Sequence, residues 1–262
     1  MAYLLLEVKV KTSLPNRNGF VLDRGRITWY SLSVCGRFIV SNPKAILHEV
    51  LGEHERSEIE ARYNVTPGQT SSVVTVGEND SRCLTEMQWG LVPSWVSQPT
   101  TGHRMINARV ETVGEKPAFR ESVAHRRCVV PADGFYEWQK SAGGKQPYLL
   151  RLNTGTPFGF AGLWDCWRGS DGHVLETFTI LTTVANALVE PIHKRMPVIL
   201  DRQQREAWLL PWTRPEGIHQ FCEPFPASAM ETIPVSDYVN NPAHDSVECV
   251  QAVPLPDRQT LF

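Results

Sequence analysis

Cys35 opens the run Cys35-Gly36-Arg37-Phe38 and directly follows Val34. Valine is the residue that an internal GUG initiation codon would display, so a chain begun at position 34 and stripped of its first residue would have Cys35 as its N-terminus. An N-terminal cysteine carries an amine next to its thiol, and that pair condenses with aldehydes. A cysteine between apolar residues is otherwise a small buried hydrophobe. The rest of the chain has to decide between these two interpretations.

Glu137 is the second candidate for chemistry. It stands in the run Phe135-Tyr136-Glu137-Trp138, where strand alternation places Phe135 on the face of Glu137 and the other two aromatic residues on the opposite face. A carboxyl group crowded by aromatic rings should have a raised pKa, which suits a general acid or base near neutral pH. An edge-strand carboxylate paired with an arginine is the alternative.

His193 and two polar or aromatic segments complete the candidates. His193 precedes Lys194 and Arg195, whose like charge should lower the pKa of the imidazole and leave it neutral, and an ordinary surface histidine is the alternative. Residues 89–95 place two tryptophans and a proline around a turn, which fits either a core turn or a surface that stacks on nucleobases. Residues 107–112 offer an amide, a guanidinium and a carboxylate, and in isolation they are typical of a solvated or capping stretch.

Composition limits the classes of protein to consider. With 262 residues and 42% apolar content, the chain can form one large domain or two small ones around a real core. Its formal net charge of -2 means that DNA binding would need a local basic patch. The six cysteines contain no C-x-x-C pair, which argues against zinc and against a disulfide scaffold, and favours reduced thiols in a cytosol. The apolar run from Tyr3 to Leu6 is too short for a signal peptide or a membrane helix.

Short β-like stretches dominate the chain and are separated by Gly, Pro, Asn and Asp. They cover residues 72–76, 83–89, 127–130, 135–138, 148–152, 158–163 and 174–183. The sequence contains neither a repeat nor a linker that would split the region between Cys35 and about Val250. The pattern predicts one α+β domain with a barrel-like, mainly antiparallel sheet and a few flanking helices.

Three helices are expected beside these strands. The first begins at the cap residue Asn42, has Pro43 at its first helical position and should end at Gly52. A second helix is expected over residues 184–189. The third covers residues 201–210, starts with a capping-box-like pattern and stops at a proline.

Six motifs follow one another along the chain, and their ordered set is far more specific than any one of them. They are Cys-Gly-Arg-Phe at 35–38, Tyr-Asn-Val-Thr-Pro-Gly at 63–68, Trp-Gly-Leu-Val-Pro-Ser-Trp at 89–95, Asn-Ala-Arg-Val-Glu-Thr at 107–112, Gly-Phe-Tyr-Glu-Trp at 134–138 and His-Lys-Arg-Met-Pro at 193–197. With these motifs, the chain resembles the SOS response-associated peptidase (SRAP) family of abasic-site processing proteins. A catalytic and DNA-binding domain over residues 35–250 is then expected between an N-terminal extension, residues 1–34, that is non-native or removed, and a tail, residues 251–262.

The resemblance implies which residues act. Its four catalytic positions fall on Cys35, Asn107, Glu137 and His193. Its contacts to single-stranded DNA around the lesion fall on Arg37, Pro67, Trp95, Arg109 and Thr182. It implies neither a metal nor a cofactor.

The implied reaction is covalent. The α-amine of Cys35 would attack the open-chain aldehyde of an abasic site, and its thiol would then close a thiazolidine ring. In this hypothesis Asn107 orients the amine and the sugar, Glu137 shuttles protons and His193 assists the opening of the sugar ring. The intermediate Schiff base also permits β-elimination, so weak lyase activity on abasic DNA is expected.

Other functions remain open at this point. The same residues could cleave the bond between Val34 and Cys35, so a cysteine-type peptidase that acts on itself or on other proteins is the alternative function. A non-catalytic binder of single-stranded DNA is a further one, and it would treat undamaged and abasic DNA alike.

Partners and location follow from the same resemblance. The expected partner is single-stranded DNA with abasic sites, bound by a monomeric cytoplasmic protein that associates with the nucleoid and not with a membrane. The chain ends in Pro-Asp-Arg-Gln-Thr-Leu-Phe at 256–262, which is loosely similar to tails that dock on a sliding clamp. Arg258 stands where such tails carry glutamine, and an ordinary frayed tail is the alternative.

Overall fold

The computed structural model of the chain describes residues 22–23, 26–27, 35–51, 59–77, 81–99, 105–141, 144–210, 215–221 and 223–254. Contacts divide the chain into two compact units, Met1–Leu32 and Ser33–Phe262. In the first unit, β1 (Leu22–Asp23) and β2 (Arg26–Ile27) form a two-residue antiparallel pair. All other elements belong to the second unit.

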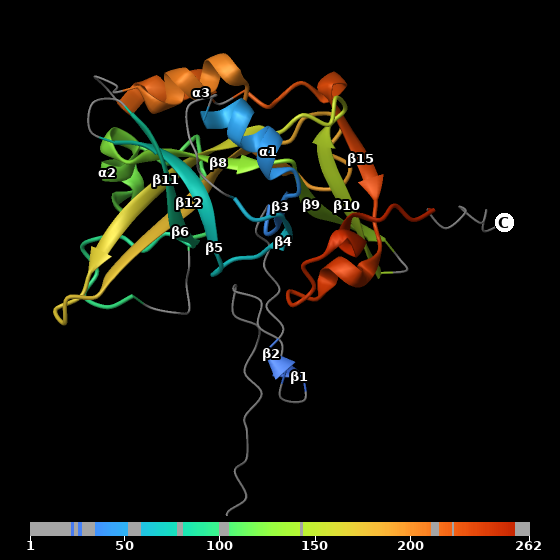
Figure 1. The fold of residues 1–262 in the computed structure, drawn as a ribbon, viewed down its shortest axis with the longest axis horizontal. Helices are drawn as coiled ribbons and strands as arrows, with labels where there is room; N and C mark the ends of the chain where they lie inside the picture. The colour runs from blue at the N-terminus through green and yellow to red at the C-terminus, as the bar shows by residue number, and fades with distance from the viewer. Residues whose placement is uncertain are drawn as a thin grey trace, which may run out of the picture. The chain divides into compact units, whose positions relative to one another are not determined.

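A closed barrel of five strands forms the centre of the second unit (Figure 1). Its members are β5 (Thr70–Val76), β6 (Arg82–Trp89), β8 (Arg127–Ala132), β11 (Phe158–Arg168) and β12 (Val174–Val184). Antiparallel pairs join β6 to β5, β5 to β8, β8 to β11 and β11 to β12, and a parallel pair between β12 and β6 closes the ring. The barrel-like, mainly antiparallel core predicted from the sequence is therefore confirmed.

A second, fully antiparallel sheet continues from the barrel. Its order is β15 (Met230–Pro234), β10 (Gly144–Leu152), β9 (Gly134–Ser141), β3 (Phe38–Val40) and β4 (Arg62–Val65). Asp133 alone separates β8 of the barrel from β9 of this sheet, and its buried carboxylate accepts hydrogen bonds from the backbone amides of Ser41 and Asn42. That carboxylate holds the segment after β3 against the junction of the two sheets.

Three further short strands pair with strands of the barrel. β7 (Asn107–Arg109) pairs with β12 in parallel, β13 (Arg195–Pro197) pairs with β12 and β14 (Ile199–Leu200) pairs with β11. Asn107 therefore lies on a strand that pairs with β12, and His193 lies just before another strand that pairs with β12.

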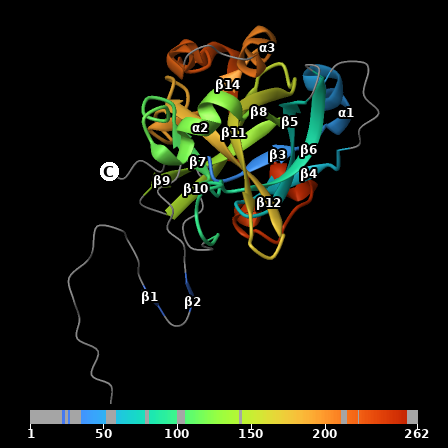
Figure 2. The ribbon, with the colours of Figure 1, turned by 90° about the vertical axis from the view of Figure 1, so that its left-hand side faces the viewer.

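Helices flank the two sheets (Figures 1 and 2). They are α1 (Pro43–Ile46), continued by the π-helical turn η1 (Leu47–Leu51), then α2 (Pro117–His125) and α3 (Arg202–Leu209), with 3-10 turns at η3 (Pro215–Phe221), η4 (Ala227–Ala229), η5 (Asp237–Asn240) and η6 (Val247–Val250). The predicted capping box of α3 is present, because Asp201 and Gln204 bond each other's backbone amides. In the described part of the chain, no helix is both long and apolar enough to cross a membrane.

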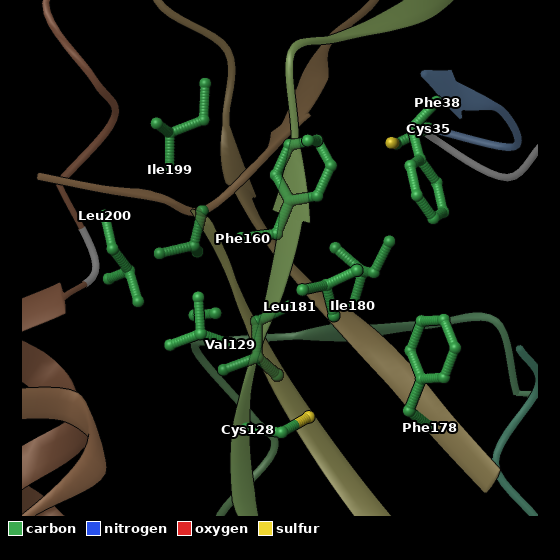
Figure 3. Packing of buried hydrophobic residues seen from close by; sticks show 14 of the residues in the cluster. Cys35, Phe38, Cys128, Val129, Phe160, Phe178, Ile180, Leu181, Ile199 and Leu200 are labelled. Carbon is green, nitrogen blue, oxygen red and sulfur yellow. The ribbon is translucent and has the colours of Figure 1, made fainter. Parts of the chain in front are cut away.

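The core of the barrel contains aromatic rings that reach up to Cys35. Phe38 packs edge-on against Trp89 and Phe160, with ring centroids 5.1 and 6.1 Å away, and Trp89 stacks on Phe178 at 6.3 Å. Figure 3 shows Cys35 at one end of this buried cluster, beside Phe38. Trp89 is thus a core residue.

The predicted strands are all confirmed, but two local predictions are wrong. Residues 184–189 do not form a helix, because β12 runs to Val184 and the Asn186 side chain then accepts bonds from the amides of Leu188 and Val189, which closes a single turn before Pro191. Residues 107–109 form strand β7 instead of a capping stretch. The helix end predicted at Gly52 and the clamp-like tail predicted at 256–262 lie outside the described residues.

The close packing of β11 in the barrel leaves no room for a side chain at Gly162. An added Cβ would lie 2.8 Å from Cys128 Sγ and 3.0 Å from Val130 Cγ2. We therefore expect Gly162→Ala to lower the free energy of unfolding by about 1–3 kcal/mol through overpacking, as measured by urea denaturation. Gly114→Ala is the control, because nothing lies within 4 Å of its added Cβ. Equal urea midpoints for the two variants would contradict this account of the barrel.

Candidate active site

Cys35 lies where the chain enters the second sheet, three residues before β3. It is fully buried and has a backbone φ of 45°, which lies in the left-handed region that only glycine adopts without strain. Its nitrogen donates a 2.6 Å hydrogen bond to Glu137 Oε1. Burial, and then the charge of Glu137, raise the pKa of the Cys35 thiol well above its ordinary value. The thiol is therefore protonated at neutral pH, and its reactivity depends on a nearby base.

Glu137 is that nearby group. It is 4% exposed on β9, and burial raises the pKa of its carboxyl to about 7 although hydrogen bonds from the backbone amides of Cys35 and Trp138 lower it. The sequence-based prediction of a raised pKa is confirmed. A carboxyl group that exchanges its proton near neutrality, 2.6 Å from the Cys35 nitrogen, can act there as an acid and as a base.

His193 lies in the turn between β12 and β13. Its Nδ1 is within 3.2 Å of both the amide and the carbonyl of Arg195, so this nitrogen can accept from the amide when neutral and donate to the carbonyl when protonated. Burial lowers the pKa of His193, as do the charges of Lys140 and Arg195, against the Arg195 backbone hydrogen bond that raises it. The predicted direction is confirmed, but burial is its main cause, and one of the two charges comes from β9.

The side chain of Gln139 connects the strand of Glu137 to the turn of His193. Gln139 Nε2 donates to the carbonyl of Pro191 at 3.2 Å, and Tyr148 Oη donates to Gln139 Oε1 at 3.2 Å. Because Gln139 is two residues after Glu137, it lies on the same face of β9. The strand that carries Glu137 therefore also holds the turn that carries His193.

Asn107 is coupled to the Cys35 segment through Trp89. The indole Nε1 of Trp89 donates to the carbonyl of Ile106 at 2.9 Å, directly before Asn107, and the Trp89 ring packs against Phe38. Asn107 itself is half-buried on β7, in register with Ile180 of β12. Trp89 thus contacts a residue next to the candidate asparagine and a residue in the segment of the candidate cysteine.

Pro67 and Trp95 lie on the surface in two separate turns. Pro67 precedes Gly68, whose amide donates to the Trp89 carbonyl at 2.8 Å, and Gly68 has the positive φ that this turn requires. Trp95 follows in the segment after Trp89 and is 67% exposed. Of the two tryptophans in this motif, one therefore belongs to the core and the other to the surface.

Arg109 and Thr182 are neighbours on β7 and β12 but differ in exposure. Arg109 is exposed, whereas Thr182 is 2% exposed and both its carbonyl and its hydroxyl accept from Arg195 Nη2, at 2.6 and 3.3 Å. Arg195 also forms a two-pronged ion pair with Glu111, at 2.5 and 2.9 Å. Arg109 can therefore meet a phosphate directly, while Thr182 lies beneath the surface.

Arg37 faces the C-terminal part of the domain. Its guanidinium donates to the carbonyls of Val239 and Asn240 and lies 5.5 Å from the ring centroid of Trp138, whose Nε1 donates to Asn240 Oδ1 at 2.7 Å. Sequence reasoning missed Trp138 as a partner of Arg37, although its position directly after Glu137 was a signal that it borders the site. Arg37 therefore holds η5 beside the site.

The described cysteines carry no disulfide. Five of them are free thiols, at Cys35, Cys83, Cys128, Cys166 and Cys249. Within the described residues, no group of three or more His, Cys, Asp or Glu side chains is arranged to hold a metal ion.

Comparisons with known proteins agree with this arrangement. The family model described as SOS response associated peptidase (SRAP) matches residues 34–242. The abasic site processing protein YoqW of Bacillus subtilis is 37% identical over 224 residues, which cover 84% of this chain and 100% of the relative. The abasic site processing protein HMCES of Gallus gallus is 34% identical over 211 residues, which cover 68% of this chain and 60% of the relative.

A solved structure shows the same fold. The crystal structure of a protein from Bacteroides thetaiotaomicron superposes with a TM-score of 0.73 at 29% identity, and the match covers 84% of this chain and 100% of that one. The family predicted from six ordered motifs is thus confirmed by sequence and by structure. This chain belongs to the SOS response associated peptidase (SRAP) family.

Proposed function

We propose that this chain, once Cys35 is its N-terminal residue, recognises abasic sites in single-stranded DNA and forms a covalent thiazolidine crosslink with them. The observation that carries the proposal is the 2.6 Å contact between the Cys35 nitrogen and Glu137 Oε1 in a buried site. With residues 1–34 absent, that nitrogen would be an α-amine. The names of the relatives, which are abasic site processing proteins, support the same substrate.

The reaction balances without an added reagent. The neutral α-amine of Cys35 attacks the C1′ aldehyde of the open-chain abasic sugar and gives a carbinolamine, which loses water to form an imine. The thiol sulfur then adds to the imine carbon, the nitrogen takes a proton and a five-membered ring closes. Glu137, with a pKa of about 7, gives a proton to the departing hydroxyl and takes one from the thiol.

Two further residues serve the sugar. His193, which its lowered pKa leaves neutral at physiological pH, would take the proton of the sugar hydroxyl as the ring opens to the aldehyde. Asn107 would orient the amine and the sugar from β7, whose position Trp89 fixes relative to the Cys35 segment. A slow β-elimination from the same imine would give weak lyase activity.

Single-stranded DNA would contact the exposed residues of the site. Pro67 and Trp95 offer apolar surfaces for the bases beside the lesion, and Arg109 offers a guanidinium to a flanking phosphate. Arg37 and Thr182 would contribute indirectly in the arrangement seen here, since protein groups already engage both side chains.

Removal of residues 1–34 by the same site is a second candidate function. The Cys35 sulfur would add to the Val34 carbonyl as Glu137 takes the thiol proton, and the C–N bond would break as Glu137 passes that proton to the leaving nitrogen, which leaves a thioester that water hydrolyses. Two observations favour it: Glu137 already contacts that nitrogen, and the left-handed φ of Cys35 strains the residue that would be released.

The crosslink can be tested with protein that begins at Cys35. Incubated with single-stranded DNA that carries one abasic site, it should give a slower band on a denaturing gel, and Cys35→Ala should lose that band because no thiol closes the ring. Since the N-terminal amine of the Cys35→Ala variant still forms an imine, borohydride should trap a band for this variant as well.

Cys166→Ala, which removes another free thiol, is the matched control and should keep the stable band. A stable band that survives Cys35→Ala would overturn the thiazolidine. Failure of borohydride to trap any band with Cys35→Ala would show that the amine is not the attacking group.

The buried Glu137 carboxyl predicts a pH-dependent stability. Folding raises its pKa from 4.5 to about 7, so the folded state holds this proton more tightly, and the stabilisation present below pH 4.5 is lost as the pH rises through 7. Relative to the parent chain, Glu137→Gln should therefore gain up to ~3 kcal/mol of unfolding free energy between pH 4 and pH 8. Urea denaturation at both pH values measures this gain. A gain of the opposite sign would contradict a raised pKa.

Self-processing is tested on the full chain. Mass spectrometry after expression of residues 1–262 should find a product that begins at Cys35, and both Cys35→Ala and Glu137→Gln should leave the chain uncut because each lacks one of the two groups required. Cleavage of the Cys35→Ala chain at the same bond would assign the cut to another protease.

A further inference from the structure

Trp95 is an unusual surface residue in this domain. Among the large exposed apolar side chains of the described residues it is both the largest and the most exposed, at 67%. An exposed indole ring offers a flat apolar surface on which a nucleobase can stack. What holds it there is therefore relevant to what it binds.

The backbone around Trp95 is anchored at every second residue. The amide of Gly90 donates to the Phe178 carbonyl at 2.8 Å, and the amide of Val92 donates to the Thr177 hydroxyl at 2.9 Å. These two bonds attach the segment to β12. Up to Val92, alternate amides of the segment bond to β12, as they would in an extended strand.

Beyond Val92, the segment is bonded to side chains of β11 and no longer to β12. Asp165 Oδ2 accepts from the amide of Ser94 at 2.9 Å, and Trp167 Nε1 donates to the carbonyl of Val96 at 2.8 Å. Ser94 and Val96 are the two neighbours of Trp95, so the residues on both sides of the exposed ring are held to β11. Asp165 and Trp167 are two residues apart and therefore lie on one face of β11.

Both anchors are rigid in their turn. Asp165 is 4% exposed, and its other oxygen accepts from the amide of Cys166 at 2.8 Å and pairs with Arg126 Nε at 3.2 Å. Trp167 is 7% exposed and packs edge-on against His173, with centroids 6.3 Å apart. Burial and these further contacts restrict the movement of both side chains, and with it the movement of the segment that they hold.

We propose that Asp165 and Trp167 are positioning residues, which hold Trp95 ready to stack on a nucleobase of single-stranded DNA. The inference rests on the proposed function, in which Trp95 is a DNA contact. A ring carried on a preorganised backbone binds a base without the loss of backbone freedom that a mobile loop would suffer. Affinity for DNA would thus depend on two buried side chains that do not touch DNA.

The test is a double-mutant cycle on protein that begins at Cys35, with a DNA that cannot react. The probe is a fluorescent single-stranded oligonucleotide with one tetrahydrofuran site, which lacks the aldehyde, and the measured quantity is Kd from anisotropy. Trp167→Phe removes the indole donor to Val96 and should raise Kd by about 3- to 10-fold. In the Trp95→Ala background the same change should alter Kd by less than about 2-fold, because its effect acts through Trp95.

Trp164→Phe is the matched control on the opposite face of β11, since among the described residues its side chain has no hydrogen bond to the segment 90–96, and Kd should not change. If Trp167→Phe loses its cooperative thermal transition, Asp165→Asn takes its place in the cycle. An equal effect of Trp167→Phe with and without Trp95 would overturn the positioning role. An unchanged Kd for Trp95→Ala alone would overturn the stacking contact in the proposed function instead, and with it this inference.

Discussion

A carboxyl group buried against a backbone nitrogen is the constraint on which the site depends. Glu137 has almost no access to water, so its proton is held to about pH 7, and its oxygen lies 2.6 Å from the nitrogen of Cys35. Such an arrangement is costly in a protein that gains nothing from it, because the ionised form is poorly solvated. It becomes useful when that nitrogen takes part in a reaction that needs a proton moved in both directions near neutral pH.

The two sheets explain how this contact is maintained. β9 carries Glu137 and continues from barrel strand β8 through Asp133, whose carboxylate also holds the backbone after β3. The Cys35 segment is held from the other side, where Phe38 packs against Trp89 of the barrel. Strand pairing between β3 and β9 then leaves little freedom in how far Cys35 lies from Glu137. The barrel acts as a support, and the candidate site lies where the second sheet continues from it.

The sequence predicted what depends on local pattern. Alternation along residues 135–138 was sufficient to place Glu137 among buried rings, and the ordered motifs were sufficient for the family and its barrel. The engagement of Arg37 was beyond reach, because its partner Asn240 is 203 positions away in the chain. The helix expected at 184–189 failed because one side chain, Asn186, closes a turn that propensity alone does not reveal. Long-range pairing and single capping bonds are therefore the features of the fold that the sequence alone did not predict.

The protonated state of the Cys35 thiol bears on the order of steps in the proposed reaction. Burial and the charge of Glu137 both raise the thiol pKa, so little thiolate is available to act as the first nucleophile in the crosslinking reaction. The nitrogen, by contrast, already faces a carboxyl group that can accept its proton. Attack by the amine would come first. Protonated Glu137 would then give its proton to the departing hydroxyl group and become a carboxylate. That carboxylate is then the base that the thiol lacked, so the first step would prepare the second within a single buried pair of residues.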